Sequence, residues 1–353
     1  MLNKSATVNH SRLLWGVVVF FVVAAIGLYW SKWNPYYHKA FTAANEHSIG
    51  ASIISGEAAT AAAPSWHTAW EYCLVYFKAI WKAFIVGIIL ASLVQVLVPR
   101  DWIRRVLGKT SYGSTLIAGL SSLPGMMCTC CAAPVVVGLR NQSSSVGAAV
   151  AFWFGNTALN PAVLIFMFFV LGWKFTVLRL LFGIILVFGV SYLANRFVKE
   201  NANAAAFDKN VVEPLPVQEG SLWTRWVKSL GTMSVSLIPA YILTVLTLGA
   251  FRAWLFPAIG DQWGNSLLVI IGFAIVGTLF VIPTAAEIPI IQTMMSFGLG
   301  GGPAAALLIT LPVISLPSML MVGRSLTWRV IAFLAASVAV VGVIAGLIGR
   351  FVL

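Results

Sequence analysis

The fold is decided by a proline-interrupted apolar stretch, Leu123-Pro124-Gly125-Met126-Met127-Cys128-Thr129-Cys130-Cys131-Ala132-Ala133-Pro134. It lies within an apolar segment, residues 112–138, and a second apolar segment, 265–299, is interrupted in the same way by Pro283 and Pro289. Because proline removes a backbone donor and clashes with the preceding turn, each segment is predicted to be a broken or re-entrant helical hairpin. Non-helical backbone at membrane depth is tolerated where it is buried in protein or lines a polar cavity, so both interruptions indicate a binding site.

The composition around these interruptions is that of an integral membrane protein. Of 353 residues, 60% are hydrophobic and 9% are charged, whereas soluble domains carry about 25% charged residues. The 22 Lys and Arg residues against 10 Asp and Glu are interpreted as topology signals, so we expect no nucleic-acid partner. Little chain is left for a soluble catalytic domain, and all four histidines fall between residues 10 and 67, away from the apolar body. We therefore predict neither an enzyme nor a cofactor.

Seven other apolar runs are long enough to cross a bilayer, which takes about 20 residues. They are residues 13–30, 70–99, 143–171, 174–197, 227–250, 303–323 and 328–350. The first run is predicted to be an uncleaved anchor helix, because the bulky residues from Trp30 to Trp33 do not form a signal-peptidase site. Residues 31–69 are predicted to form a loop outside the membrane, bounded by interfacial aromatic side chains.

The second half of the chain repeats landmarks of the first half at an offset of 155 residues. Pro134 superposes on Pro289, and Trp173 superposes on Trp328. A mixed-charge stretch that contains two prolines separates the halves. The predicted parts are an anchor helix with its extracytoplasmic loop, a first transmembrane repeat, a cytoplasmic linker and a second transmembrane repeat, in residues 1–69, 70–197, 198–222 and 223–353.

The distribution of basic residues orients these repeats, because cytoplasmic loops collect Lys and Arg. If both interrupted segments cross the membrane fully, the repeats are parallel and the basic residues divide almost evenly between the two sides. If both are re-entrant, the repeats are inverted and most basic residues, including the cluster at 100–109, face the cytoplasm, while Lys32 and Arg179 lie outside. We favour this second arrangement. The predicted fold is an all-α polytopic membrane protein of two inverted repeats with broken or re-entrant helical hairpins, plus one extra N-terminal helix.

Three of the four cysteines lie in the first interruption. Cys128, Cys130 and Cys131 follow Met126 and Met127 directly. Thiolates and thioethers select soft species such as Cu(I), Zn(II) or trivalent arsenic. The three cysteines are therefore predicted to bind substrate and are candidate ligands of a metal ion. Cysteines also serve as small apolar fillers of buried space, and that structural alternative stays open.

An acidic residue lies in the second interruption. Glu287 is the only acidic residue after Leu222 apart from Asp261, which is expected in a loop. Because intramembrane carboxylates are costly and mark ion or proton pathways, Glu287 is predicted to be the proton-coupling residue. The alternative is a carboxylate that is solvated at the hairpin mouth or paired with an arginine.

Amide and hydroxyl side chains flank both interruptions. Asn156, Thr157 and Asn160 precede Pro161, which frees backbone carbonyls, and Thr284 and Ser315 supply hydroxyl groups from the second half. These five residues are predicted to line a polar substrate cavity. Hydrogen bonding between transmembrane helices is the alternative role for such side chains.

Together these motifs resemble the YraQ-type predicted permeases, the group that includes the bacterial organoarsenical efflux permeases. The likeness covers about residues 70–350 and is carried by Leu-Pro-x-x-x-Cys-x-Cys-x-x-x-Pro at 123–134, Gly138-Leu139-Arg140, Gly147 to Phe152 and Thr157-x-x-Asn160-Pro161. The resemblance implies an inner-membrane permease of two similar halves with the cysteine motif close to the transport path. Some members export trivalent organoarsenicals. This chain departs from the pattern in Cys131 and in the two methionines before the motif, and the extra thiol could retune affinity towards a metal ion.

We therefore expect a multi-pass permease of the bacterial inner membrane, with the lipid bilayer and a small molecule or ion as its partners. The expected activity is secondary transport that exports a small thiophilic solute, such as a trivalent organoarsenical or a soft metal ion, through the cysteine-containing site. The alternative is a passive channel or an importer of a small anion or organic solute, in which the cysteines are structural. Whether the protein forms a homodimer is left open.

Overall fold

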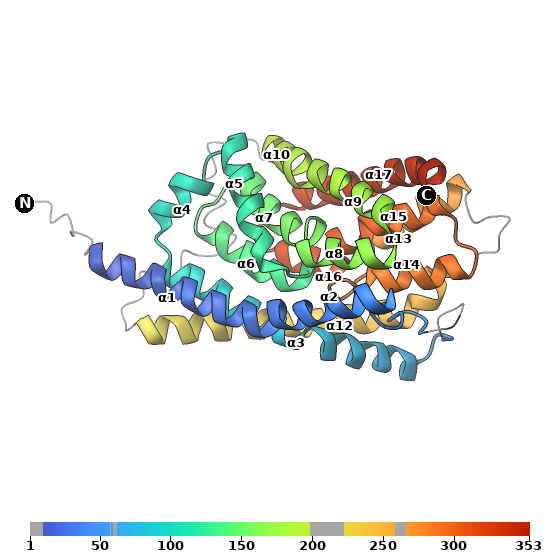
Figure 1. Cartoon of the computed structure of the whole chain (residues 1–353). Coiled ribbons are helices and arrows are strands. Elements are labelled where there is room, and N and C mark those ends of the chain that lie inside the picture. The colour runs from blue at the N-terminus through green and yellow to red at the C-terminus, as the bar shows by residue number, and fades with distance from the viewer. Residues whose placement is uncertain (1–9, 57, 59–61, 198–221, 258–265) are drawn as a thin grey trace, which may run out of the picture.

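The computed structural model describes residues 10–56, 58, 62–197, 222–257 and 266–353. The linker predicted at 198–222 lies outside the described residues except for Leu222. Across the described ranges the chain is helical, and the β-type contact there is an isolated bridge between Ser52 and Gly56. The all-α prediction is confirmed for this part of the chain (Figure 1).

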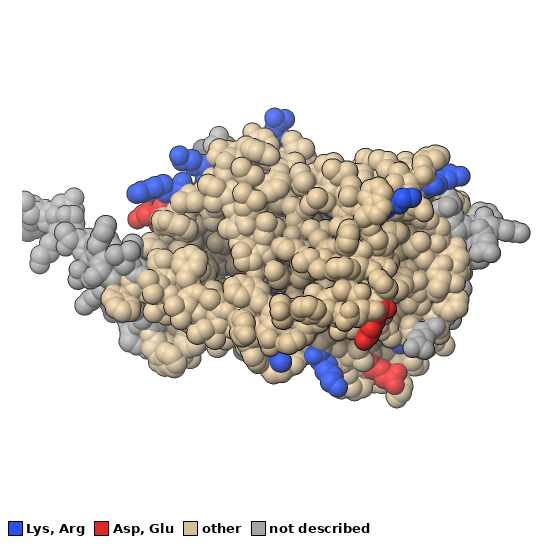
Figure 2. Space-filling view, in the orientation of Figure 1, with Lys and Arg blue, Asp and Glu red and all other residues tan. Residues whose placement is uncertain are grey.

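Seven helical segments in the described ranges are long and apolar enough to cross a membrane. They are Trp15–Glu46, Trp66–Leu97, Val146–Val170, Trp173–Phe197, Trp223–Leu255, Gly301–Val322 and Trp328–Val352. Each overlaps one of the seven apolar runs predicted from the sequence, so the multi-pass prediction is confirmed. Figure 2 shows a broad uncharged face, with lysine, arginine and acidic side chains gathered towards its margins. Such a face suits contact with lipid.

The N-terminal helix is longer than predicted. Helix α1 (His10–Leu28) continues through a π-helical turn, η1 (Tyr29–Trp33), into α2 (Asn34–Glu46). The prediction of a loop from residue 31 onwards is therefore wrong for residues 31–46. Their polar composition reflects a helix that packs on α3 and α8 and buries Ser31 and Lys32, rather than an exposed loop.

The first half of the chain contains an interrupted segment between long helices. Two elements precede it, α3 (Trp66–Leu97) and the short α4 (Arg100–Leu107). The segment itself consists of α5 (Tyr112–Ser122), the 3-10 turn η2 (Leu123–Gly125) and α6 (Thr129–Asn141). A broken span follows, α7 (Val146–Ala158) and α8 (Pro161–Val170). The last span is α9 (Trp173–Ile184), the π-helical η3 (Ile185–Val190), α10 (Ser191–Ala194) and η4 (Asn195–Phe197).

The second half repeats this order of elements. It begins with the long helix α12 (Leu222–Leu255). The second interrupted segment is α13 (Leu267–Leu279), a non-helical stretch at 280–286, and α14 (Glu287–Ser296). The broken span that follows is α15 (Gly301–Val313) with α16 (Leu316–Val322), and the chain ends with α17 (Trp328–Val352).

Hydrogen bonds between helix ends define the two ends of the bundle. At one end the Gln142 side chain, just after α6, donates to the carbonyl of Gln95 in α3 over 2.7 Å. At the other end Lys174 at the start of α9 donates to the carbonyl of Val352 in α17 over 2.9 Å. Both interruptions lie between these ends, in the interior of the bundle (Figure 1).

Close packing of α3 on α6 fixes the position of the cysteine segment. A Cβ atom at Gly87 would collide with the carbonyl oxygen of Cys131, so the two helices meet at a position that only glycine fits. We predict that Gly87→Ala lowers the free energy of unfolding by about 1–3 kcal/mol, measured by denaturant unfolding in detergent micelles. Gly272→Ala is the control, because a Cβ atom at Gly272 would meet nothing within 4 Å. Equal stability of the two variants would contradict this account of the contact.

Candidate functional site

The first interruption is held open by side chains that take its freed backbone groups. Pro124 and Gly125 end the helix, and Met126 has a left-handed conformation with φ of 48°. The indole of Trp33 donates to the carbonyl of Pro124 over 2.8 Å, and the indole of Trp153 donates to the carbonyl of Thr129 over 3.0 Å. The carbonyl of Thr129 is buried and needs such a partner, whereas the bond from Trp33 to Pro124 lies at the exposed part of the interruption.

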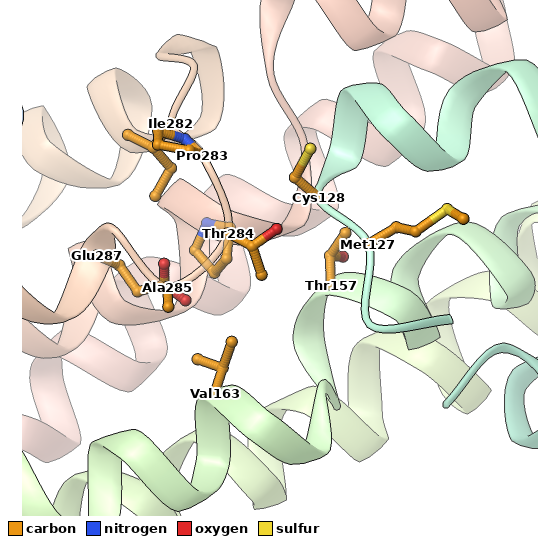
Figure 3. Close-up of a pocket in the computed structure, with 10 residues that line it drawn as sticks. Met127, Cys128, Thr157, Val163, Ile282, Pro283, Thr284, Ala285 and Glu287 are labelled. Carbon is orange, nitrogen blue, oxygen red and sulfur yellow. The ribbon is translucent and has the colours of Figure 1, made fainter. Parts of the chain in front are cut away.

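The second interruption is supported in the same way. The phenol of Tyr72 donates to the carbonyl of Val281 over 2.6 Å. Ala285 has a left-handed conformation with φ of 71°, and α14 begins two residues later at Glu287. The turn therefore presents Thr284 and Glu287 towards the first interruption (Figure 3).

A small cavity lies between the two interruptions (Figure 3). It is lined by residues from both interruptions and from the helix breaks beside them, namely Met127, Cys128, Thr157, Val163, Ile282, Pro283, Thr284, Ala285, Glu287 and Pro312. Four of the predicted site residues meet here, although up to 159 positions separate them in the sequence. The cavity lining is mostly apolar with a few convergent polar groups, a composition that ligand sites share.

The cysteines form a pair and a separate third thiol. Cys128 caps the start of α6, and its Sγ lies 2.9 Å from the Sγ of Cys131, one helical turn further on. Cys130 instead lies 3.6 Å from the hydroxyl groups of both Thr129 and Ser315. Adjacent helical residues point about 100° apart, so Cys130 and Cys131 cannot face one point. Nowhere in the described ranges do three His, Cys, Asp or Glu side chains group to hold a metal ion, and the three-cysteine metal site is not formed in this conformation.

Ser315 joins the first interruption to the second broken span. Its hydroxyl lies 3.1 Å from the hydroxyl of Thr129 and 2.9 Å from that of Ser318. Both Ser315 and Thr129 are buried. Ser315 thus contacts the cysteine segment rather than the cavity lining, which fits a role in holding Cys130.

The predicted polar residues of the first half take three different places. Thr157 lines the cavity, whereas Asn156 packs beside the first interruption and accepts from the backbone N–H of Met127 over 3.4 Å. Asn160 accepts from the backbone N–H groups of Ala162 and Val163, and so caps α8. Asn160 therefore stabilises the helix break in this conformation and does not reach the cavity.

Glu287 forms a buried ion pair with Arg179. Arg179 Nη1 donates to Glu287 Oε1 over 2.6 Å, and the two residues are each 1% exposed. Arg179 also donates to the carbonyls of Thr157 and Ala158, over 2.8 and 3.1 Å. Pro161 lacks the N–H that would otherwise bond Thr157, so the arginine takes a carbonyl that the break frees. The sequence prediction places Arg179 outside the membrane; in the structure its side chain is instead buried within the candidate span Trp173–Phe197.

The other oxygen of Glu287 is free of such contacts. Oε2 is buried and has no hydrogen-bond partner among the described residues, while Glu287 lines the cavity. The guanidinium group compensates the charge of the carboxylate, and the second oxygen remains available to a proton or a solute that enters the cavity.

Lys32 is a second basic residue that sequence reasoning placed outside. It lies on η1, is 6% exposed, and donates from Nζ to the hydroxyl groups of Thr284 and Tyr36, each over 2.9 Å. Its neighbour Trp33 contacts the first interruption through Pro124. The N-terminal helix therefore touches both interruptions through consecutive residues.

The sequence carries a signal for one of these two cations, Arg179, and none for Lys32. Arg179 lies five residues inside the apolar run that begins at 174, where an intramembrane Glu287 would need a partner. Lys32 was hidden, because a lysine flanked by tryptophans at the end of an apolar run also matches an interfacial anchor.

Comparison with known proteins agrees with this architecture. The chain matches the family model described as "Predicted permease" over residues 65–351. It is 50% identical over 332 residues to the UPF0718 protein YraQ of Escherichia coli (strain K12), across 94% of each chain. It is 22% identical to the UPF0718 protein MJ0584 of Methanocaldococcus jannaschii (strain ATCC 43067 / DSM 2661 / JAL-1 / JCM 10045 / NBRC 100440), across 76% of this chain and 92% of that protein. No solved structure matches the chain.

Proposed function

Because the chain belongs to the predicted-permease family, as the resemblance in its cysteine motif indicated, we propose that it is a secondary transporter that exports a small thiophilic solute. The observation that carries this proposal is the pair of thiols, Cys128 and Cys131, of which Cys128 lines a cavity between two helix interruptions in the bundle interior. Two neighbouring thiols supply the soft donor type that a trivalent organoarsenical or a soft metal ion selects. The bacterial relative supports placement in an inner membrane.

The proposed architecture is a pair of inverted repeats with re-entrant hairpins. Helix α5 has 11 residues and thus extends about 16 Å, roughly half of a bilayer core. The end of α6 contacts the end of α3 through Gln142, at the end of the bundle where α4 and α7 also meet. The second hairpin contacts the opposite end of the bundle, because Gln292 of α14 donates to the carbonyl of His47, the residue that follows α2. Opposite entry of the two hairpins supports inversion, and rocking of one repeat against the other would give alternating access.

Glu287 is the proposed coupling residue. It is the one buried acidic side chain in the described ranges, and it lines the cavity. Because Arg179 compensates its charge, protonation requires the ion pair to separate during the transport cycle. A passive channel for a small anion or organic solute is the second candidate, since it shares the broken helices and needs no coupling carboxylate.

Transport into everted vesicles tests the thiol site. We expect Cys128→Ser together with Cys131→Ser to abolish uptake of the transported member of a panel of methylarsenite, arsenite, Cu(I) and Zn(II), because a hydroxyl group binds soft centres poorly. Cys73→Ser is the matched control, because Cys73 is a buried cysteine of α3 outside the cavity lining. Full uptake by a folded double variant would contradict the thiol mechanism and favour structural cysteines.

A further inference from the structure

The buried ammonium group of Lys32 has neutral partners. Both of its hydrogen bonds go to hydroxyl groups, those of Tyr36 and Thr284. Across the described ranges the ion pairs are His67 with Glu71, Asp101 with Arg104, and Arg179 with Glu287, so no carboxylate there neutralises Lys32. A charged lysine in a bundle interior is costly unless an anion accompanies it.

The charges nearest the cavity do not balance. Arg179 and Glu287 neutralise each other, which leaves the ammonium of Lys32 as the uncompensated charge beside Thr284. A cation that entered the cavity would meet a like charge, whereas an anion would supply the counter-charge that Lys32 lacks.

The backbone holds Lys32 at this position. The π-helical turn at residues 29–33 lies where the N-terminal helix meets the two interruptions, and such turns are frequent at functional sites. Trp33 donates to Pro124 in the first interruption while Lys32 donates to Thr284 in the second. The ammonium group is thus fixed between the two halves of the protein rather than free to reach water.

We propose that Lys32 is a specificity-determining residue that makes the cavity accept a small solute with net negative charge and reject free metal cations. The proposal rests on the proposed function in that it takes the same cavity as the transport site, and it removes the free metal cations from the thiophilic solutes considered there. It also assigns the N-terminal helix, which lies outside the matched range of 65–351, a part in solute selection.

Thiol-reactive probes that share one reactive group and carry head groups of opposite charge test this proposal without knowledge of the natural solute. The full chain carries Cys73→Ser, Cys130→Ser and Cys131→Ser, so that Cys128 is the remaining thiol. In proteoliposomes, mass spectrometry follows its modification by an anionic methanethiosulfonate (sulfonatoethyl) and a cationic one (trimethylammonioethyl). The same Cys128 thiolate attacks both reagents, forming a mixed disulfide and displacing methanesulfinate, so the ratio of the two rates cancels any change in thiol reactivity.

We expect the anionic-to-cationic rate ratio to fall at least about tenfold in Lys32→Met and to stay near its original value in Lys32→Arg. Lys82→Met is the matched control. The Lys82 ammonium lies over the ring of Trp30, 5.3 Å from its centroid, so this substitution removes the same charge from the neighbouring helix. Its ratio should change less than about twofold. An unchanged ratio in Lys32→Met, or a Cys128 that does not react with the anionic reagent when Lys32 is present, would overturn the proposal. Neither outcome depends on transport. Failure of the proposed thiol mechanism would instead be detected by the uptake assay with Cys128→Ser and Cys131→Ser, so the two failures can be told apart.

Discussion

Replacing Arg179 with glutamine should lower the free energy of unfolding by about 3–5 kcal/mol, because it leaves the Glu287 carboxylate buried without its counter-charge. The loss has a second source, since Arg179 also satisfies the carbonyls of Thr157 and Ala158 at the helix break. Denaturant unfolding in detergent micelles, followed by tryptophan fluorescence, measures the change.

A double-mutant cycle isolates the ion pair from these carbonyl contacts. Arg179→Gln together with Glu287→Gln should be more stable than the sum of the two single changes predicts, because neither charge is then left alone. Lys174→Gln is the control on the same helix; Lys174 is exposed, its bond to the Val352 carbonyl faces solvent, and glutamine keeps a side-chain donor, so the replacement should change stability by less than about 0.5 kcal/mol. If Arg179→Gln unfolds like the unaltered protein, the pair does not stabilise the folded state.

Replacing Glu287 with glutamine should abolish accumulation of solute against its gradient while downhill flux continues. The reason is that glutamine cannot exchange a proton, so movement of the solute is no longer linked to the proton gradient. Uptake into everted vesicles is compared with and without an imposed proton gradient, using the solute identified by the serine variants. The ratio of inside to outside concentration should fall to about one.

Two control variants distinguish loss of proton coupling from loss of folding. Glu287→Asp keeps a carboxylate and should retain part of the accumulation, whereas Glu71→Gln removes an exposed carboxylate of α3 and should retain all of it. Full accumulation by Glu287→Gln would place the coupling group elsewhere. Absence of accumulation in the unaltered protein would favour a passive channel.

The membrane spans and their interruptions could be predicted from local sequence, whereas the long-range partners of the two buried cations, Arg179 and Lys32, could not. Long apolar runs and internal prolines are local signals, and each predicted run overlaps a helix of the structure. The pairing of Arg179 with Glu287 joins positions 108 apart, and that of Lys32 with Thr284 joins positions 252 apart. Single residues carry no mark of a distant partner, so both cations were assigned by the rule for flanking basic residues.

The site illustrates the same limit at shorter range. The cysteine motif correctly predicted the position of the interruption. It did not predict that Cys130 and Cys131, although adjacent in sequence, contact different residues because they lie on different faces of α6. Cys131 faces Cys128, while Cys130 faces Ser315 of the second half. Asn160 was grouped with Asn156 and Thr157 by proximity, yet its place directly before Pro161 made it a helix cap, which the Asn-Pro pair could have indicated.

The contacts of η1 constrain the order in which helices insert into the membrane and dock during synthesis. In a chain that is inserted during synthesis, the segment carrying Lys32 enters the membrane first, but its partner Thr284 is made 252 residues later. At about 5–20 residues per second, on the order of 10–50 s pass between the two events. Until then the ammonium group can stay hydrated only at the headgroup level, where a lysine reaches water along its own stem. This helix is therefore made early, but its contact with the second interruption forms only after the segment that carries Thr284 has been inserted.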